Sequence, residues 1–350
     1  MSEIVRLVSI ATAVPPHVVQ QRDAATAAHA CFADRFSEFS RLARVFESAE
    51  IKQRHTVRPL DWYFQPLGWP ERHAAYIEGA GKLFEAVALK VLQAANLTGS
   101  DVDVVVTVSS TGIATPSLDA RAAARLGFRA DIERVPVFGL GCAGGVAGLS
   151  IAAKLAKAKP GCVVLLVVVE TCSLAFRMDK LTKENIVATA LFGDGAAACI
   201  LCTDTVGIAS FEMSGQQTWA DTLDIMGWSV DAQGLGVIFD RAIPPFAEAH
   251  VALAVTKILA NAGLSLPDVD RFICHPGGAK VITALEKALA LTKGTLDYER
   301  EVLAEYGNMS ACTVLFVLDR AIKAGLPPRS ILLAMGPGFS LSCASLVQGA

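Results

Sequence analysis

The sequence predicts an α/β protein with five layers, αβαβα, made of two pseudo-duplicated halves. The first observation behind this prediction is that two landmarks recur in one register. Asp101-Val102-Asp103 begins an apolar strand, and Asp268-Val269-Asp270 begins another at an offset of 268 − 101 = 167 positions. Gly141-Cys142 and Gly307-Asn308 each open a helix that is followed by a strand, at an offset of 307 − 141 = 166 positions. Strand–helix–strand units repeated in one order indicate a duplication.

The second observation is the composition of the strands. Residues 102–108, 162–169, 272–275 and 331–334 are nearly continuous apolar runs, which is typical of strands buried on both faces. The helices that begin at the two glycine landmarks are rich in glycine and alanine. Two sheets that share this layer of small-residue helices, each covered by further helices, give the five layers.

The two halves are predicted as residues 1–205 and 206–350. The first half carries the candidate nucleophile, and the second carries a histidine and an asparagine. Residues 20–85 form a helical, charge-rich insertion that only the first half contains, with helical periodicity over 22–46 and 71–95.

Composition excludes several classes of protein. With 350 residues, 53% hydrophobic residues and a formal net charge of −3, the chain can bury a large core and lacks the basic surface that nucleic acid requires. Its longest apolar run, residues 162–169, is too short for stable membrane insertion. Because the N-terminus lacks a signal-peptide pattern, a cytoplasmic protein is expected. Nine cysteines without tandem Cys-x-x-Cys pairs predict neither a disulfide framework nor a metal site.

Cys142 is the candidate nucleophile. It follows residues 135–137, which have the pattern of a strand, and it stands among glycines at a helix start. Unpaired N–H groups and the helix dipole favour a thiolate at such a position. The alternative is a buried cysteine that only fills space in a tightly packed helix start.

The duplication brings two further residues to the same place. Cys142 corresponds to Asn308, and the strand that ends at residues 109–112 in the first half ends at His275 in the second. Corresponding ends meet at the junction of the halves, so Cys142, His275 and Asn308 are predicted to share one site. The imidazole can accept the thiol proton, and the amide can donate to an oxyanion. No carboxylate occupies a third position, so a triad with an acidic member is not expected.

These residues stand in motifs that resemble the type III polyketide synthases, the chalcone-synthase-like branch of the thiolase superfamily. The matching stretches keep the family's order and spacing over nearly the whole chain: Gly141-Cys142-Ala143-Gly144-Gly145, Leu191-Phe192-Gly193-Asp194-Gly195-Ala196-Ala197, His275-Pro276-Gly277-Gly278, Tyr306-Gly307-Asn308-Met309-Ser310 and Gly336-Pro337-Gly338-Phe339. The resemblance implies a thiolase-like fold, a homodimer, and acyl-CoA and malonyl-CoA as substrates without a cofactor. It further implies that a starter acylates Cys142, and that His275 and Asn308 stabilise the enolate formed when malonyl-CoA loses carbon dioxide.

The resemblance also implies substrate-binding residues. Phe192 resembles a gatekeeper at the mouth of the CoA tunnel, although outside its motif it would be taken for a core residue. Ser310 lies in the asparagine motif, and Gly336-Pro337-Gly338 resembles the scaffold of the cyclisation loop. Lys52 and Arg54 fall where the family holds CoA phosphates, but a solvated helix face would explain them equally well.

Three positions depart from the plant enzymes of this family. Ala175 stands where they have a threonine that lines the cavity, Val237 aligns with their second gatekeeper phenylalanine, and Thr115 replaces a methionine that reaches across the dimer. The two smaller cavity residues predict space for a long aliphatic chain. The chain therefore most resembles the bacterial members that extend fatty acyl-CoA to alkylpyrones or alkylresorcinols.

Other functions stay open at this point. A chalcone-, stilbene- or phloroglucinol-type synthase with another starter is one alternative, and a ketoacyl synthase III-like condensing enzyme is another. The motifs at His275 and Gly336 argue against the ketoacyl synthase. A catalytically silent, lipid-binding paralogue is a third alternative, and the presence of all three catalytic residues argues against it.

Overall fold

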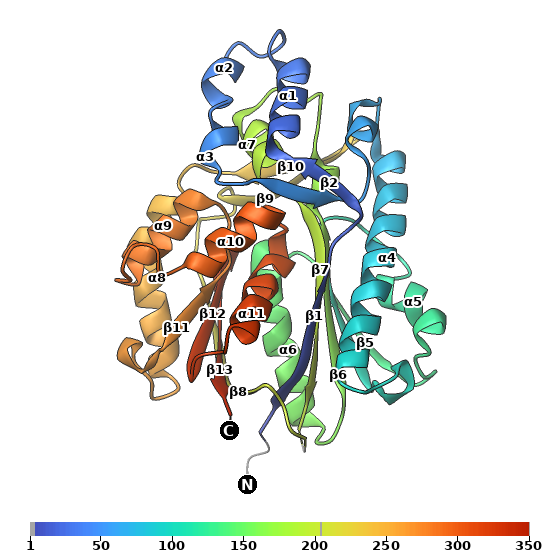
Figure 1. Ribbon diagram of the computed structural model, residues 1–350, viewed down its shortest axis with the longest axis vertical. Helices are drawn as coiled ribbons and strands as arrows, with labels where there is room; N and C mark the ends of the chain where they lie inside the picture. Colours follow the sequence, from blue (N-terminus) through green and yellow to red (C-terminus); the bar gives the residue numbers. More distant parts are fainter. Residues whose placement is uncertain (1–3, 204, 350) are drawn as a thin grey trace.

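The first half of the chain runs from blue to green in Figure 1, and the computed structural model describes residues 4–203 and 205–349. The strands of this half are β1 (Arg6–Ala13), β2 (His17–Gln20), β3 (Gln53–Thr56), β4 (Val104–Val108), β5 (Glu133–Val137), β6 (Val164–Thr171) and β7 (Asp194–Cys202). Its helices are α1 (Gln21–Phe32), α2 (Phe39–Leu42), α3 (Val45–Ser48), α4 (Trp69–Ala94), α5 (Leu118–Leu126), α6 (Gly144–Ala158) and α7 (Lys183–Leu191).

The second half runs from yellow to red (Figure 1). Its strands are β8 (Ala209–Thr218), β9 (Met226–Asp231), β10 (Gly234–Phe239), β11 (Arg271–Cys274), β12 (Arg329–Gly336) and β13 (Ser340–Gln348). Its helices are α8 (Ile243–Ala260), α9 (Ala279–Ala288), α10 (Asp297–Tyr306) and α11 (Thr313–Lys323).

The sheet topology confirms the pseudo-duplicated fold class. A nine-stranded sheet has the order β11-β12-β13-β8-β1-β7-β6-β4-β5. Read outward from its centre, β1-β7-β6-β4 and β8-β13-β12-β11 repeat one pattern of two antiparallel pairs and one parallel pair. The two predicted sheets are nevertheless joined, because β1 and β8 pair over the short stretch Arg6↔Ser210 and Leu7↔Ala209.

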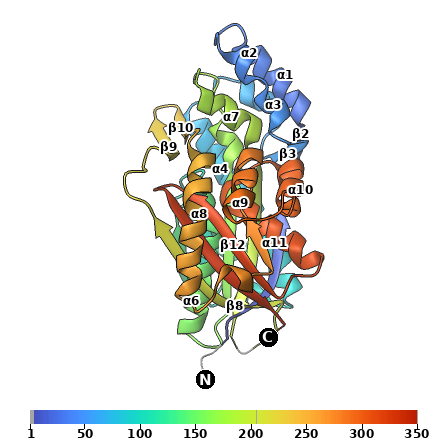
Figure 2. The same ribbon diagram turned by 90° about the vertical axis from the view of Figure 1, so that its left-hand side faces the viewer.

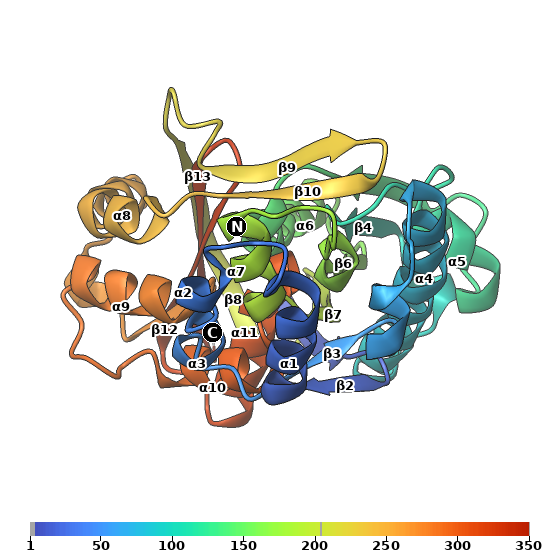
Figure 3. The same ribbon diagram turned by 90° about the horizontal axis from the view of Figure 1, so that it is seen from above.

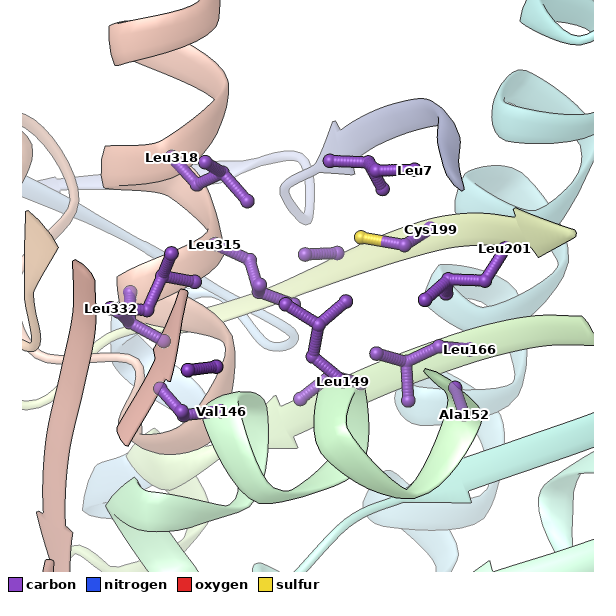
Figure 4. Packing of buried hydrophobic residues seen from close by; sticks show 14 of the residues in the cluster. Leu7, Val146, Leu149, Ala152, Leu166, Cys199, Leu201, Leu315, Leu318 and Leu332 are labelled. Atoms are coloured by element: carbon purple, nitrogen blue, oxygen red, sulfur yellow. The ribbon is translucent and has the colours of Figure 1, made fainter. Parts of the chain in front are cut away.

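Helices α6 and α11 form the central layer between the two halves of the sheet. Helix α6 contacts β4, β6 and β7 on one side and β12 and β13 on the other. Leu149 of α6 and Leu315 of α11 lie in one buried cluster with side chains from both halves of the sheet (Figure 4). A Cβ on Gly145 would lie 2.1 Å from the Ala311 carbonyl oxygen, so the small residues of α6 allow the two central segments to touch.

The outer layers are α4 with α5 on one face and α8 with α9 on the other (Figures 1 and 2). Helix α4 packs on β1, β6 and β7, so it belongs to the repeated core. The segment 20–85 therefore contains the start of a core helix, and the added part is β2, β3 and α1 to α3. The second half has its own addition between β8 and α8, the antiparallel hairpin of β9 and β10, which the periodicity did not predict.

Among the described residues, α8 is the one helix long and apolar enough, by length and composition alone, to cross a membrane. Its buried residues include Ile243, Val251 and Val255, and the helix contacts α9, β8 and β13. The apolar face of α8 is thus used in the outer layer of the fold.

Candidate active site

Cys142 lies where the sequence places it, in a 3₁₀ turn (Gly141–Ala143) between β5 and α6. Gly141 has a φ of +47°, and a Cβ there would lie 2.6 Å from Pro337 Cδ, so this position requires glycine. The Ser110 hydroxyl accepts hydrogen bonds from the N–H groups of Gly139 (3.1 Å) and Gly141 (3.3 Å). One hydroxyl therefore holds the segment that leads into Cys142 at two points.

The protonation state of Cys142 differs from the thiolate that the helix start predicts. Burial raises the pKa of the Cys142 thiol to about 12, because the charged form loses its hydration. The thiol donates to the Ser310 hydroxyl at 3.6 Å, and this contact lowers the pKa only in part. At neutral pH the resting sulfur is a neutral thiol, since desolvation outweighs the partial charges of the helix start.

His275 follows β11 and is held through its backbone, whose N–H donates to the Leu333 carbonyl at 2.7 Å. The residue is 5% exposed, and neither ring nitrogen has a hydrogen-bond partner among the residues that the structure describes. Burial lowers the pKa of His275 to about 3, so the ring is neutral at physiological pH. A buried imidazole with two unsatisfied nitrogens is costly unless a ligand completes it, and no described carboxylate orients it.

Asn308 is fully buried, and its side-chain amide is held in one orientation. Its Oδ1 accepts from the Ser310 N–H at 2.8 Å, and its Nδ2 donates to the Gly277 carbonyl at 3.1 Å. That second bond uses one of the two Nδ2 hydrogens. The other hydrogen is the group that could meet an oxyanion.

A chain of contacts joins the three predicted catalytic residues. Ser310 touches both Cys142 and Asn308. Asn308 bonds to Gly277, and the His275 ring packs over Gly277, where an added Cβ would lie 3.7 Å from His275 Nε2. The structure thus brings residues from β11, the α10–α11 loop and the α6 start to one place.

A cavity of about 40 Å³ lies beside Cys142. Four of the predicted substrate-binding residues line it: Phe192, Val237, Ser310 and Pro337. The Phe192 backbone forms a bridge with Asn308, since the Asn308 N–H donates to Leu191 and the Gly193 N–H donates to Asn308. The backbones of Phe192 and Asn308 are therefore positioned by the same hydrogen bonds.

Gly336 and Gly338 shape the loop around Pro337. A Cβ on Gly336 would lie 2.4 Å from the Leu140 carbonyl oxygen, and Gly338 has a φ of +92°. These two glycines allow the loop to lie against the Cys142 turn. Both glycines thus act through the conformation of the backbone.

Two other predicted residues, Ala175 and Arg54, are buried away from the places that the sequence suggests. Ala175 is buried in the turn Cys172–Ala175, where Cys172 and not Ala175 lines the cavity, so the predicted effect of Ala175 on the size of the cavity stays a prediction. Arg54 is 3% exposed and donates to the carbonyls of Thr189, Ala190 and Phe192. This buried guanidinium holds the segment 189–192 and cannot reach a CoA phosphate in solvent.

Lys52 and Thr115 lie on the surface. Neither lines the cavity beside Cys142. The position of Thr115 is compatible with a contact to a second subunit, which stays a prediction.

Sequence reasoning missed the β9–β10 hairpin as a wall of the cavity. The hairpin supplies Met226, Gly227, Trp228, Ile238 and Phe239 to the lining, in addition to Val237. The Trp228 indole N–H donates to the Ser110 carbonyl at 2.8 Å, and its ring meets Phe192 edge-on at 6.2 Å. No sequence signal identified it, because the first half has no matching hairpin.

Sequence reasoning also missed a groove of about 440 Å³ that opens outside Gly277 and Gly278. Its walls come from α2, α3, α7 and the start of α9, and Phe239 lines both this groove and the cavity. Lys183, Arg241 and Lys280 place cationic groups along it, against Glu184 and Asp240. These cations, and not Arg54, are in a position to meet a phosphate.

Glu170 is a fully buried carboxyl beside the site. Its Oε2 accepts from the Ser110 N–H (3.0 Å) and the Thr111 hydroxyl (2.7 Å), yet burial raises its pKa from 4.5 to about 8. Between these two pH values the unfolded chain has released the proton that the folded protein still holds. The stability contributed by this group therefore falls as pH rises through that window.

Glu170→Gln should flatten the pH dependence of stability. Between about pH 5 and about pH 8, the free energy of unfolding of the wild type should fall on the order of a few kcal/mol further than that of the variant. Urea unfolding at both pH values measures this difference. Burial also raises the pKa of Asp194, to about 6. Asp194 therefore lowers the free energy of unfolding with rising pH equally in the wild type and in Glu170→Gln. Equal slopes would mean that Glu170 is already ionised in the folded state.

Comparisons with known proteins agree with this geometry. Models of the chalcone and stilbene synthases match the chain over residues 3–205 (N-terminal domain) and 210–347 (C-terminal domain). A 1,3,6,8-tetrahydroxynaphthalene synthase of Streptomyces peucetius subsp. caesius is 39% identical over 347 residues, covering 97% of this chain and 91% of that protein. The alpha-pyrone synthesis polyketide synthase-like Pks18 of Mycobacterium tuberculosis (strain ATCC 25618 / H37Rv) is 29% identical over 349 residues, covering 95% and 88%.

The same likeness holds for the three-dimensional structure. The crystal structure of 1,3,6,8-tetrahydroxynaphthalene synthase from Streptomyces coelicolor A3(2), a bacterial type III polyketide synthase, superposes with a TM-score of 0.93. The two sequences are 28% identical, and the match covers 99% of each chain.

Proposed function

This chain belongs to the chalcone and stilbene synthase family and is a type III polyketide synthase, and we propose that it extends a long-chain fatty acyl-CoA with malonyl-CoA to an alkylpyrone or alkylresorcinol. The family membership decides against the ketoacyl synthase III-like alternative. The starter and the product go beyond the family, and they rest on the cavities described below.

The proposed reaction starts with transfer of the acyl group from CoA to Cys142 Sγ. The carbonyl carbon forms a bond to Sγ, its bond to the CoA sulfur breaks, and the Cys142 proton leaves with that sulfur as the CoA thiol. His275, a neutral base with two free nitrogens, is the group suited to relay this proton. Because burial raises the pKa of the Cys142 thiol, we propose that this proton transfer accompanies substrate binding.

Malonyl-CoA then loses carbon dioxide, and the remaining electron pair forms an enolate. The free Nδ2 hydrogen of Asn308 and a ring N–H of His275 are proposed to hold the enolate oxygen. The enolate carbon attacks the thioester carbonyl on Cys142, the bond to Sγ breaks, and the chain leaves on CoA, two carbons longer. A buried, largely apolar cavity suits this carbanion chemistry, since water would protonate the enolate.

A second cavity, of about 60 Å³, is the observation that supports a long aliphatic starter. It lies on the far side of Phe192 and Cys172, which line both cavities. Its lining is mainly apolar and includes Ala24, Ala27 and Ala28 of α1. An acyl chain on Cys142 would pass between Phe192 and Cys172 and lie along α1.

A second candidate function is a small-starter synthase with a hydroxylated naphthalene as product. The 40 Å³ cavity favours it, because a long chain has to displace the Phe192 side chain before the two cavities join. The product named for the Streptomyces peucetius relative points the same way. Short- and long-chain starters therefore have to be compared directly.

The deciding experiment incubates the enzyme with malonyl-CoA alone and with acetyl-, p-coumaroyl- or palmitoyl-CoA, and identifies products by mass spectrometry. We expect palmitoyl-CoA to give triketide or tetraketide masses. Ala28→Phe, which fills the second cavity, should lower turnover of palmitoyl-CoA about tenfold or more while turnover of acetyl-CoA changes little. Ala30→Phe, on the exposed side of α1, is the matched control.

Two outcomes would contradict the proposal. A naphthalene-type product from malonyl-CoA alone, with no long-chain product, would favour the second candidate. Equal loss with palmitoyl- and acetyl-CoA in a folded Ala28→Phe protein would mean that the second cavity does not hold the acyl chain.

CoA itself is proposed to lie in the basic groove, with its phosphates near Lys183, Arg241 and Lys280. A homodimer in the cytoplasm completes the proposal. The exposed side chains of Ile113 (49%) and Phe138 (60%) support the dimer. Ile113 lies in the loop between β4 and α5, and Phe138 directly follows the edge strand β5. A second subunit at this edge would cover both apolar side chains.

A further inference from the structure

The β9–β10 hairpin stands apart from the nine-stranded sheet (Figure 3). Its two strands pair with each other, from Gly234↔Asp231 to Phe239↔Met226, and form a separate two-stranded sheet. The hairpin nevertheless supplies half of the residues that line the Cys142 cavity. The position of this wall is therefore set by contacts other than the main sheet's hydrogen bonds.

The end of the hairpin is held by ionic contacts of Asp231. Arg177 donates to both Asp231 carboxylate oxygens, at 2.9 and 3.3 Å, and Lys180 Nζ lies 2.8 Å from Oδ2. We call these contacts of Asp231 with Arg177 and Lys180 the hairpin latch. The Gln233 N–H also donates to Asp231, at 2.9 Å, and fixes the carboxylate within the turn.

The anchor side of the latch is rigid. The Arg177 side chain is 1% exposed, and Asp179 accepts from its Nε at 2.7 Å and its Nη2 at 2.5 Å. Asn185 of α7 donates to the carbonyls of Arg177 and Lys180, at 2.7 and 2.9 Å. Asp179 thus immobilises Arg177 from the side that faces away from the hairpin.

Away from the latch, the wall has few polar attachments. The Trp228 bond to the Ser110 carbonyl holds it beside the nucleophile turn, and the Asp240 N–H donates to the Ile225 carbonyl at 2.9 Å at its base. Val237, Ile238 and Phe239 lie on β10, the strand next to α7. Releasing Asp231 would remove the ionic contacts from the far end of both strands, where the packing of Gly234 and Leu235 near Trp69 and Arg72 would then hold the hairpin.

We propose that the hairpin latch is a specificity-determining device, with Asp231 as a positioning residue that sets how many malonyl units are added before ring closure. The inference rests on the proposed chain extension at Cys142. Ring closure competes with the next extension at every cycle, and a fixed wall limits how far a growing chain can extend before it folds back. If the β9–β10 wall is displaced, the volume around the end of the growing polyketide changes. The ratio of triketide to tetraketide products should change with it.

The test compares substitutions of the two carboxylates, Asp231 and Asp179, that bind the Arg177 guanidinium. Asp231→Asn releases the hairpin, whereas Asp179→Asn removes the other carboxylate and leaves the hairpin attached. With the starter that the wild type uses best, Asp231→Asn should change the ratio of triketide to tetraketide products by about threefold or more, and Asp179→Asn should leave it within about twofold. Hydrogen exchange of the amides in residues 226–239 should accelerate in Asp231→Asn alone.

Several results would overturn the inference. An unchanged product ratio in folded Asp231→Asn would overturn it, even if the hairpin amides exchange faster. An equal change of the ratio in Asp231→Asn and Asp179→Asn would also overturn it, because the change would then come from Arg177 and not from release of the hairpin. If Asp231→Asn does not fold, Lys180→Gln, a milder release, should shift the ratio in the same direction, and no shift would overturn the proposal. A wild-type enzyme that forms no polyketide would refute the proposed function itself, whereas a normal wild type with unaffected variants would refute only the latch.

Discussion

Cys142→Ala should abolish polyketide formation, by on the order of 10³-fold or more, and leave malonyl-CoA decarboxylation measurable. Without the sulfur no starter thioester can form on the enzyme. The amide of Asn308 keeps its orientation, because its bonds go to Ser310 and Gly277 and not to the cysteine. The variant loses one weak contact, from the thiol to the Ser310 hydroxyl, so the fold should persist.

Product analysis by mass spectrometry, with release of carbon dioxide from malonyl-CoA measured in parallel, separates the two activities. Cys343→Ala, a buried thiol in β13 outside the cavity lining, is the matched control and should retain both. Loss of both activities in a folded Cys142→Ala protein would contradict the assignment of decarboxylation to His275 and Asn308.

His275→Ala should impair both condensation and decarboxylation, by about 10²- to 10³-fold each. The enolate forms in both reactions, and one ring N–H of the neutral His275, whose nitrogens have no other partner among the described residues, is the donor proposed to hold the enolate oxygen together with Asn308. His275→Gln keeps an N–H donor and should recover part of the decarboxylation. Because the His275 pKa is about 3, ring protonation should not limit the wild-type rate at or above about pH 5.

The same paired assays test this assignment, with His250→Ala as the control. His250 is exposed on α8 and packs against Phe246 at 4.3 Å, away from the cavity lining. Wild-type decarboxylation in His275→Ala would contradict the proposed role of the histidine. A loss restricted to condensation would instead assign His275 to the acyl-transfer step.

Much of the fold could be predicted because the chain repeats its own landmarks. The matched offsets at Asp101 and Asp268, and at Gly141 and Gly307, identify equivalent elements, and apolar runs such as 162–169 are legible as buried strands without knowledge of their neighbours. The repeat also explains why Cys142, His275 and Asn308 could be predicted together. Their place follows from which strand or helix they end or begin, and that is local information.

Features that occur in only one half were missed, because no repeated landmark identifies them. The β9–β10 hairpin has no counterpart in the first half, and its cavity residues, among them Trp228 and Phe239, look like those of any amphipathic strand. Arg54 was misplaced because its sequence neighbours are polar, whereas its guanidinium is buried against carbonyls of the segment 189–192. Cys172 and not Ala175 lines the cavity, although both lie in one tight turn three residues apart, because the fold of the turn and not the sequence decides which side chain faces inward.

The sequence by itself determined the fold class and the family and predicted the nucleophile, since these depend on periodicity, glycine positions and motif order along the chain. Only the tertiary structure decided the protonation states of Cys142 and His275, because desolvation depends on the atoms that close over a group from distant segments. It likewise decided the walls of the cavity and the hairpin latch. Volume and charge pairing arise from side chains that meet only when the two halves pack together.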